Sequence, residues 1–272
     1  MNRNTLAALS LTASLSLTLA ACGSGGGTAQ SPAPAASTPP AASGAPSGGV
    51  EDGVLTVGME CAYAPGAYAN GYDVMIAQRI CDANGWELEV VSTAWDSLIP
   101  ALQSGTIDVA IAGQSMTADR MAQVDMAGPY YYADIVCLTT AGSAYAAAQG
   151  IADLAGGRCT AQSGTIWYDT CLPQIPDAQI QTAAETAPAM VMQLQTGAVD
   201  FVCTDLPTAT AAAANDSDLI VLNFAGTDGD FQFAVAKGST ELLDAINAVL
   251  DGMTADDFNT LMDQAIAVQP EV

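Results

Sequence analysis

The sequence contains no histidine and very few positive charges. Without an imidazole, the chain lacks the usual general base of hydrolases and every Ser-His-Asp arrangement. Lysine and arginine together number 5, against 29 acidic residues, and the formal net charge is −24. Nucleic-acid binding depends on cations that neutralise phosphates, so this composition excludes an ordinary nucleic-acid-binding protein.

The 7 cysteines form no C-x-x-C motif, which, with histidine absent, argues against a zinc site. No metal and no cofactor is expected. Apart from Cys22, the cysteines can be paired in many ways, and the sequence does not choose among them. Several lie in apolar runs, where a buried free thiol fits equally well. These six are Cys61, Cys81, Cys137, Cys159, Cys171 and Cys203.

The first 50 residues differ in composition from the rest. Arg3 precedes an uncharged run from Thr5 to Ala21, which is typical of a signal peptide and short for a membrane span. The tetrapeptide 19–22, Leu-Ala-Ala-Cys, resembles the bacterial lipobox, which implies that 1–21 is removed and Cys22 is acylated. An ordinary signal peptide cut elsewhere is the alternative. Residues 22–50 are expected to form an uncharged, solvated tether.

From residue 53 onward, strand and helix patterns alternate, which predicts an α/β fold. The pattern restarts near Arg158, which predicts that a second unit is inserted into the first. Two lobes joined by two crossings around a cleft are therefore predicted: 51–138 plus 224–272, and 141–221. The expected strands are 54–57, 88–91, 107–112, 135–138, 158–161, 178–182, 199–204, 219–222 and 231–236. The expected helices are 72–83, 95–103, a short helix after Thr117, one from about Ile166, 186–195, one opened by Asp205, 239–250 and 254–267.

Residues 108–132 contain a candidate anion site. An apolar run predicts a buried strand that ends at Gly113, and Ser115 or Thr117 can cap a short helix whose first turn holds Arg120. In open α/β sheets ligands bind beyond the carboxyl ends of strands. A helix N-terminus and a guanidinium group there would hold a carboxylate. A surface ion pair between Arg120 and Asp119 or Asp125 is the alternative.

A series of motifs carries a resemblance to a known family. In order they are Val57-Gly58, Tyr63-Ala64-Pro65, Gly71-Tyr72-Asp73-Val74, 95–102, Gly105-Thr106-Ile107-Asp108, 115–120, Val124-Asp125, Pro129-Tyr130-Tyr131, Gln162-Ser163-Gly164-Thr165, Gly197-Ala198-Val199-Asp200 and Asp205. Over residues 53–268 the chain resembles the family 3 extracellular solute-binding proteins of bacterial ABC transporters, which bind amino acids. The resemblance implies a type II periplasmic-binding-protein-like fold. In it, each lobe is a mainly parallel sheet flanked by helices, and a two-strand hinge joins the lobes.

The resemblance also implies roles for individual residues. Arg120 matches the arginine that holds the α-carboxylate of the ligand, helped by Ser115, the backbone of Gly113 and the second-lobe hydroxyl of Thr165. Asp205 matches the carboxylate that receives the α-ammonium group, although a simple helix cap is the alternative. The candidates to contact the ligand side chain are Glu60, Tyr63, Tyr72 and Trp95.

Two departures from the family pattern affect the wall of the expected side-chain pocket. Gly66 stands where an aromatic residue is usual, and Met75 where an acidic residue is frequent. The first-lobe wall is therefore expected to be thinner than in the family.

The sequence thus predicts a lipid-anchored, monomeric, non-enzymatic receptor outside the cell membrane. It would capture a free amino acid, with a polar or cationic side chain favoured, and deliver it to the permease of an ABC transporter. One alternative is an enzyme like the cyclohexadienyl or arogenate dehydratases on the same fold, with Glu60 as the acid. Another is a lipoprotein that senses its ligand and signals through a membrane partner.

Overall fold

The structure is a computed structural model that describes residues 50, 52–61, 71–224 and 228–268. The predicted signal peptide, the lipidation site Cys22, the tether and Tyr63 lie outside the described residues. Within the described part of the chain, none of the helices combines the length and apolar character that a membrane span requires.

The first lobe is built on a five-stranded sheet in which the order of strands is β2-β1-β3-β9-β4. Its first three strands are parallel, and β9 runs antiparallel to both of its neighbours, β3 and β4. The central strand β3 is buried along its whole length, as expected for an apolar run covered on both faces. The strands are β1 (Val54–Met59), β2 (Glu87–Ser92), β3 (Val109–Gln114), β4 (Val124–Thr140) and β9 (Asp228–Ala236).

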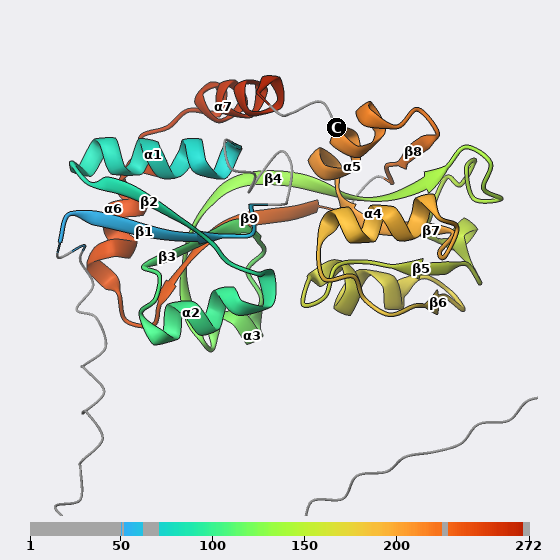
Figure 1. Cartoon of the computed structure of the whole chain (residues 1–272), viewed down its shortest axis with the longest axis horizontal. Coiled ribbons are helices and arrows are strands. Elements are labelled where there is room, and N and C mark those ends of the chain that lie inside the picture. Colours follow the sequence, from blue (N-terminus) through green and yellow to red (C-terminus); the bar gives the residue numbers. More distant parts are fainter. Residues whose placement is uncertain (1–49, 51, 62–70, 225–227, 269–272) are drawn as a thin grey trace, which may run out of the picture. The chain divides into compact units, whose positions relative to one another are not determined.

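The second lobe uses the far half of the same long strand β4. From Ile135 onward β4 pairs antiparallel with β7 on one side and, from Cys137, with β8 on the other. Beyond β7 the sheet continues in parallel through β5 and β6. Because β4 changes partners between Asp134 and Ile135, one continuous strand belongs to both lobes (Figure 1). The remaining strands are β5 (Arg158–Thr160), β6 (Gln179–Ile180), β7 (Phe201–Asp205) and β8 (Leu219–Leu222).

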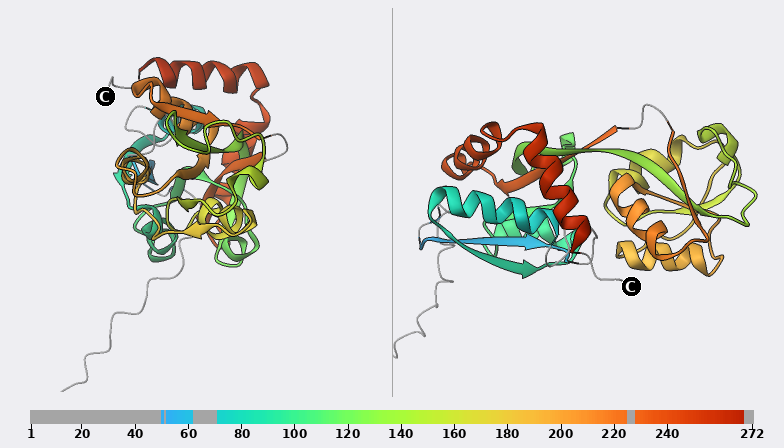
Figure 2. Two further views of the ribbon diagram at one scale, coloured as in Figure 1. Left: turned by 90° about the vertical axis from the view of Figure 1, so that its right-hand side faces the viewer. Right: turned by 90° about the horizontal axis from the view of Figure 1, so that it is seen from above.

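Helices flank both sheets, and the right-hand view of Figure 2 shows the green strand β4 extending from one group of elements into the other. In Figure 1, α1 and α2 lie on opposite sides of the first sheet. The first lobe contains α1 (Tyr72–Asn84), η1 (Trp95–Ser97), α2 (Leu98–Ser104), α3 (Ala118–Met121), α6 (Thr240–Asp251) and α7 (Ala255–Ala267). The second contains η2 (Ile151–Leu154), η3 (Trp167–Cys171), η4 (Leu172–Gln174), α4 (Ala187–Gln195) and α5 (Leu206–Asn215).

Local sequence signals explain where several of these helices begin. Thr117 caps α3 through a hydrogen bond from the backbone of Arg120, and Thr186 caps α4 in the same way from Ala189. Thr254 and Asp257 form a complete capping box on α7. Side-chain oxygens thus satisfy N–H groups that the first turn of a helix leaves without partners.

The predicted two-lobed α/β fold is confirmed, with several local differences. The strand predicted over 135–138 is the far end of β4, which begins at Val124. The strand β3 does not end at Gly113 but continues to Gln114, because its pairing with β9 shifts register there and Gly113 accommodates a φ of 66°. The helix expected from about Ile166 is a single π-helical turn, η3. Each sheet also contains antiparallel pairs, since β4 and β9 run against their neighbours. The second predicted crossing falls around 225–227, outside the described residues.

Candidate functional site

The predicted site residues follow the carboxyl ends of neighbouring parallel strands. In the first lobe, β1 and β3 are adjacent and parallel, with Gly58 opposite Ala110. Glu60 comes after β1, and Ser115 after β3. In the second lobe, β5 and β7 are adjacent and parallel, so the turn after β5 and Asp205 at the end of β7 share one edge. This is the place where α/β sheets bind ligands.

Four hydrogen bonds connect the first lobe to the turn 162–164 of the second lobe. The amide nitrogen Nε2 of Gln162 lies 2.9 Å from both carboxylate oxygens of Glu60. Ser163 Oγ donates to Asp96 Oδ2 at 2.9 Å. The carbonyl oxygen of Gly164 accepts from Nη2 of Arg120, also at 2.9 Å. The turn after β5 therefore contacts the first lobe at Glu60, Asp96 and Arg120.

Arg120 is held in place by its own lobe as well. Its Nη1 donates to the carbonyl oxygen of Ser115 at 2.7 Å, and its Cζ lies 5.5 Å from the centroid of the Trp95 ring. A cation at this distance from an indole is attracted by the ring quadrupole. Asp125, considered as an ion-pair partner from the sequence, instead lies 2.6 Å from Lys237 Nζ. The structure thus brings together Arg120, Ser115 and Trp95.

Gly164 is placed where a larger residue would not fit. Its φ is 64°, in the left-handed region that favours glycine. A Cβ atom there would come within 2.6 Å of Asp96 Oδ1 and 3.3 Å of Trp95 Nε1. The close approach of the turn to the first lobe therefore depends on this glycine.

Thr165 stabilises the same turn. It is 3% exposed, its Oγ1 donates to the carbonyl oxygen of Gln162 at 2.7 Å, and it accepts from the backbone N–H of Tyr168 at 3.4 Å. In the structure, the hydroxyl that the sequence assigned to the ligand carboxylate thus fixes the shape of the turn that carries Gly164.

Asp205 is the N-terminal cap of α5. Its carboxylate is 1% exposed and accepts from the backbone N–H of Thr208 at 2.8 Å and from the Thr208 hydroxyl at 3.2 Å. Burial raises the pKa of Asp205 to about 7, although these hydrogen bonds oppose the shift. Asp205 therefore has the geometry of a helix cap. Because its pKa is near neutral pH, a cation beside it would favour the ionised form.

Glu60 is a second buried carboxylate at the site, 7% exposed. Desolvation raises its pKa, the hydrogen bonds from Gln162 lower it, and Asp96 raises it further. Gln162 is 1% exposed and also donates to the carbonyl oxygen of Glu185 at 3.2 Å. The sequence predicted a role for Glu60 but none for Gln162, whose place directly after a strand end was the available signal.

Gly113 and Tyr72 belong to a buried network behind the site. The N–H of Gly113 donates to Tyr130 Oη at 3.0 Å, and Tyr130 Oη donates to Asp73 Oδ1 at 2.9 Å. Tyr72 is fully buried and donates to the carbonyl oxygen of Tyr130 at 3.0 Å. Burial raises the pKa of Asp73 to about 7. The backbone N–H of Gly113 is thus engaged by a tyrosine that sequence reasoning gave no role.

Comparisons with known proteins agree with this architecture. The family model of the bacterial extracellular solute-binding proteins, family 3, matches residues 55–266. A probable histidine-binding protein of Campylobacter jejuni is 31% identical over 191 residues, which is 69% of this chain and 73% of that protein.

Two solved structures show the same fold. The substrate-binding protein AbpA from Streptococcus pneumoniae, bound to L-arginine, is 26% identical with a TM-score of 0.71, covering 79% of this chain and 95% of that one. The ancestral amino-acid-binding protein AncCDT-1, a precursor of cyclohexadienyl dehydratase, is 28% identical with a TM-score of 0.70, covering 79% and 96%. The chain therefore belongs to family 3 of the bacterial extracellular solute-binding proteins, among the amino-acid-binding proteins of ABC transporters.

Proposed function

We propose that this protein captures a free α-amino acid between the strand ends of its two lobes and delivers it to an ABC importer. The observation that carries the proposal is the Arg120 guanidinium, fixed by Ser115 in one lobe and bonded to Gly164 of the other. A zwitterion needs a cation for its carboxylate and an anion for its ammonium group. Arg120 supplies the first, and Asp205, at the strand end in the second lobe, supplies the second.

The carboxylate step follows from the contacts of Arg120. The Gly164 carbonyl is a neutral acceptor on the guanidinium, and a ligand carboxylate is a stronger, ionised acceptor for the same donor group. A carboxylate bound there also lies against the turn 162–165, so it contacts both lobes. A ligand that contacts both lobes stabilises the closed arrangement through that differential contact. Closure would be a rotation of 141–218 against the remainder.

The ammonium step follows from the burial of Asp205. A carboxyl group with a pKa of about 7 is partly protonated near neutrality. An ammonium group beside it favours the charged form and lowers its pKa. Binding below about pH 7 is therefore expected to release a proton from Asp205. This coupling distinguishes a ligand contact from a cap that only begins α5.

Glu60 supports a polar or cationic side chain on the ligand. Its carboxylate is buried, faces the second lobe and is held by Gln162. Histidine, for which the Campylobacter jejuni relative is named, and L-arginine, which is bound to AbpA, are amino acids with side chains of this kind. Trp95 provides an aromatic face beside Arg120, and Tyr63 is a further candidate for the wall.

The remaining parts of the proposal concern where the receptor works. We infer that acylation of Cys22 anchors a monomer to the outer face of the cell membrane and that 22–50 tethers the lobes to it. The permease of the importer then receives the ligand. In this proposal the protein binds and releases the ligand without changing it chemically.

A dehydratase remains the second candidate because Glu60 is a buried acid whose desolvation raises its pKa. AncCDT-1, the precursor of such an enzyme, is itself described as an amino-acid-binding protein.

Thermal unfolding of the purified protein with each free amino acid tests the proposal. A ligand that binds only the folded state raises the melting temperature by mass action. At least one polar or cationic amino acid should do so in the wild type and in Arg79→Ala, whose arginine makes only an exposed ion pair with Asp257 among the described contacts, but not in Arg120→Ala. If no amino acid raises the melting temperature while the protein converts arogenate or prephenate, the protein is a dehydratase and not an amino-acid receptor.

A further inference from the structure

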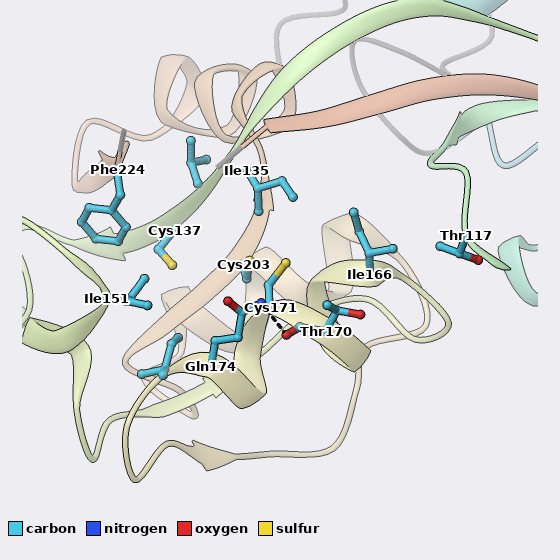
Figure 3. A pocket seen from close by; sticks show the side chains of 12 residues that line it. Thr117, Ile135, Cys137, Ile151, Ile166, Thr170, Cys171, Gln174, Cys203 and Phe224 are labelled. Carbon is cyan, nitrogen blue, oxygen red and sulfur yellow. Dashed lines mark hydrogen bonds between the residues drawn. The ribbon is translucent and has the colours of Figure 1, made fainter. Parts of the chain in front are cut away.

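A cavity lies next to the crossing strand β4, lined mainly by residues of the second lobe and also by Thr117 of the first. It has a volume of about 410 Å³ and is mostly apolar. Figure 3 shows that three of its side chains are cysteines that reach it from three different elements: Cys137 from β4, Cys203 from β7 and Cys171 from η3. None of these residues belongs to the proposed amino-acid site.

Two of the cysteines are direct cross-strand partners. Cys137 and Cys203 stand opposite each other in the antiparallel register of β4 and β7. Residues opposite each other in such a pair have Cα atoms roughly 4.5–5.5 Å apart. This lies within the range of about 4.4–6.8 Å that disulfides span. Both thiols are free and buried.

The third cysteine joins this pair from the opposite wall. Cys171 is half-buried, and its side chain is hydrogen-bonded to that of Cys203. In Figure 3 the side chains of Cys171 and Cys203 lie next to each other at the centre of the cavity. Cys203 is thus the middle member of a cluster in which each outer thiol contacts it.

The three positions differ in acidity and in access. The hydrogen bond from Cys203 lowers the pKa of Cys171, which is also the most accessible of the three. The hydrogen bonds to Cys137 and Cys171, together with burial, raise the pKa of Cys203 well above its usual range. A more accessible cysteine of lowered pKa beside a buried thiol is the arrangement of an attacking and a resolving cysteine.

We propose that this cavity is a thiol–disulfide exchange site that takes small, uncharged disulfides, with Cys171 attacking and Cys203 resolving. The apolar wall, formed in part by Ile135, Ile166 and Phe224, favours an uncharged molecule, and the chain's charge of −24 disfavours an anionic one. The proposal does not depend on amino-acid binding.

The exchange balances without a further reactant. The Cys171 thiolate attacks one sulfur of the small disulfide, forms a mixed disulfide and releases one small thiolate, which takes up a proton. The Cys203 thiol then loses its proton and attacks the Cys171 sulfur, which breaks the bond to the small molecule and releases a second thiol. The small disulfide is reduced to two thiols, and the protein gains one Cys171–Cys203 disulfide.

The test uses 2-hydroxyethyl disulfide, an uncharged probe, on the purified full chain. After the reaction is quenched with an alkylating agent, peptides mapped without reduction should show Cys171 linked to Cys203. In Cys203→Ser the reaction should stop at a stable mixed disulfide on Cys171. In Cys171→Ser the initial reaction should be at least about tenfold slower, because the most accessible thiol of the cluster is lost.

Two controls separate chemistry from folding. Cys159→Ser removes a fully buried cysteine on β5 that does not line the cavity, and it should leave the rate and the linkage unchanged. The order in which the probe modifies the cysteines is measured on the wild type. This result therefore remains valid even if Cys203→Ser fails to fold. Three results would each overturn the proposal: first modification at the partly exposed Cys61, a Cys137–Cys203 linkage with Cys171 reduced, or a Cys171 adduct that persists in the wild type.

Discussion

Arg120 and Asp205 hold equivalent places in the two lobes but differ in what surrounds them. Each lies at the first turn or the cap of a helix that follows a strand of its sheet. Arg120 is half-buried and reaches across to Gly164, whereas Asp205 is 1% exposed and bonds to Thr208 of its own helix. The Arg120 guanidinium of the first lobe therefore bonds outward to the other lobe. The Asp205 carboxylate of the second lobe also caps its own helix.

The largest expected effect is on binding when Arg120 is changed to Ala. Loss of the cation leaves a buried ligand carboxylate without its partner, which costs about 3–5 kcal/mol of binding free energy. The unfolding free energy should fall by only about 1–2 kcal/mol, because the hydrogen bonds to Ser115 and Gly164 are lost but the folded core is untouched. Titration calorimetry and urea unfolding measure the two quantities. Wild-type affinity in Arg120→Ala would mean that the arginine only connects the lobes.

The second effect is a loss of stability as the pH rises. Asp205 and Asp73 have pKa values raised to about 7, against an ordinary value of 3.8. Between these values the folded state holds protons that the unfolded state has lost, so the stability they contribute falls by up to a few kcal/mol as the pH rises from about 4 to about 7.

Urea unfolding of the unliganded protein at about pH 5 and about pH 8 checks this window. Asp73→Asn should flatten the dependence. Asp125, Asp200 and Asp257 act in another window, because their pKa values are lowered and their contribution is lost only as the pH falls below 3.8. If stability instead rises from pH 5 to pH 8, both buried carboxyls are ionised by partners of their own.

The third effect separates the two roles of Asp205. Asp205→Ala removes the cap of α5 and should lower the unfolding free energy by about 1–2 kcal/mol. Asp205→Asn keeps a good capping oxygen and should cost less stability than alanine. Asp205→Asn should weaken the binding of every amino acid, but it should not weaken the binding of a des-amino analogue, which has no ammonium group. Equal affinity of Asp205→Asn for both compounds would leave Asp205 as a cap alone.

The smallest expected effect is at Gly164. Alanine there must adopt a positive φ, which costs about 1 kcal/mol, and its methyl group meets Asp96. Affinity should therefore fall by about tenfold while Arg120 stays in place. Gly197→Ala is a matched control, because its φ is 72° but a methyl group there meets nothing within 4 Å. Equal losses in both variants would show that backbone strain, not contact with the first lobe, limits this position.

Much of the fold could be predicted because its signals are local. The apolar run of β3, the cap at Thr117 and the Asp-Leu-Pro start of α5 each depend on a few neighbouring residues. The site was harder, because its contacts join residues far apart in the chain. Nothing near Gln162 indicates that its amide lies on Glu60, and nothing near Gly164 indicates how closely it approaches Trp95.

The cysteines show the same limit. Their apolar neighbours predicted burial, and the sequence left open whether they pair. The cluster of Cys137, Cys171 and Cys203 arises from the register of β4 with β7 and from the turn η3. Register is a property of the folded sheet and cannot be read from any one segment.

The position of β9 has a consequence for the order of folding. It is the last strand of the described residues, yet it lies inside the first sheet, between β3 and β4. The second lobe uses one continuous stretch from Ile135 to Leu222, and its contacts are closer in sequence. Closing long chain segments is entropically costly and slows the pairing of distant strands. The second lobe is therefore expected to fold first. The first lobe is complete only after β9 has paired with β3 and β4.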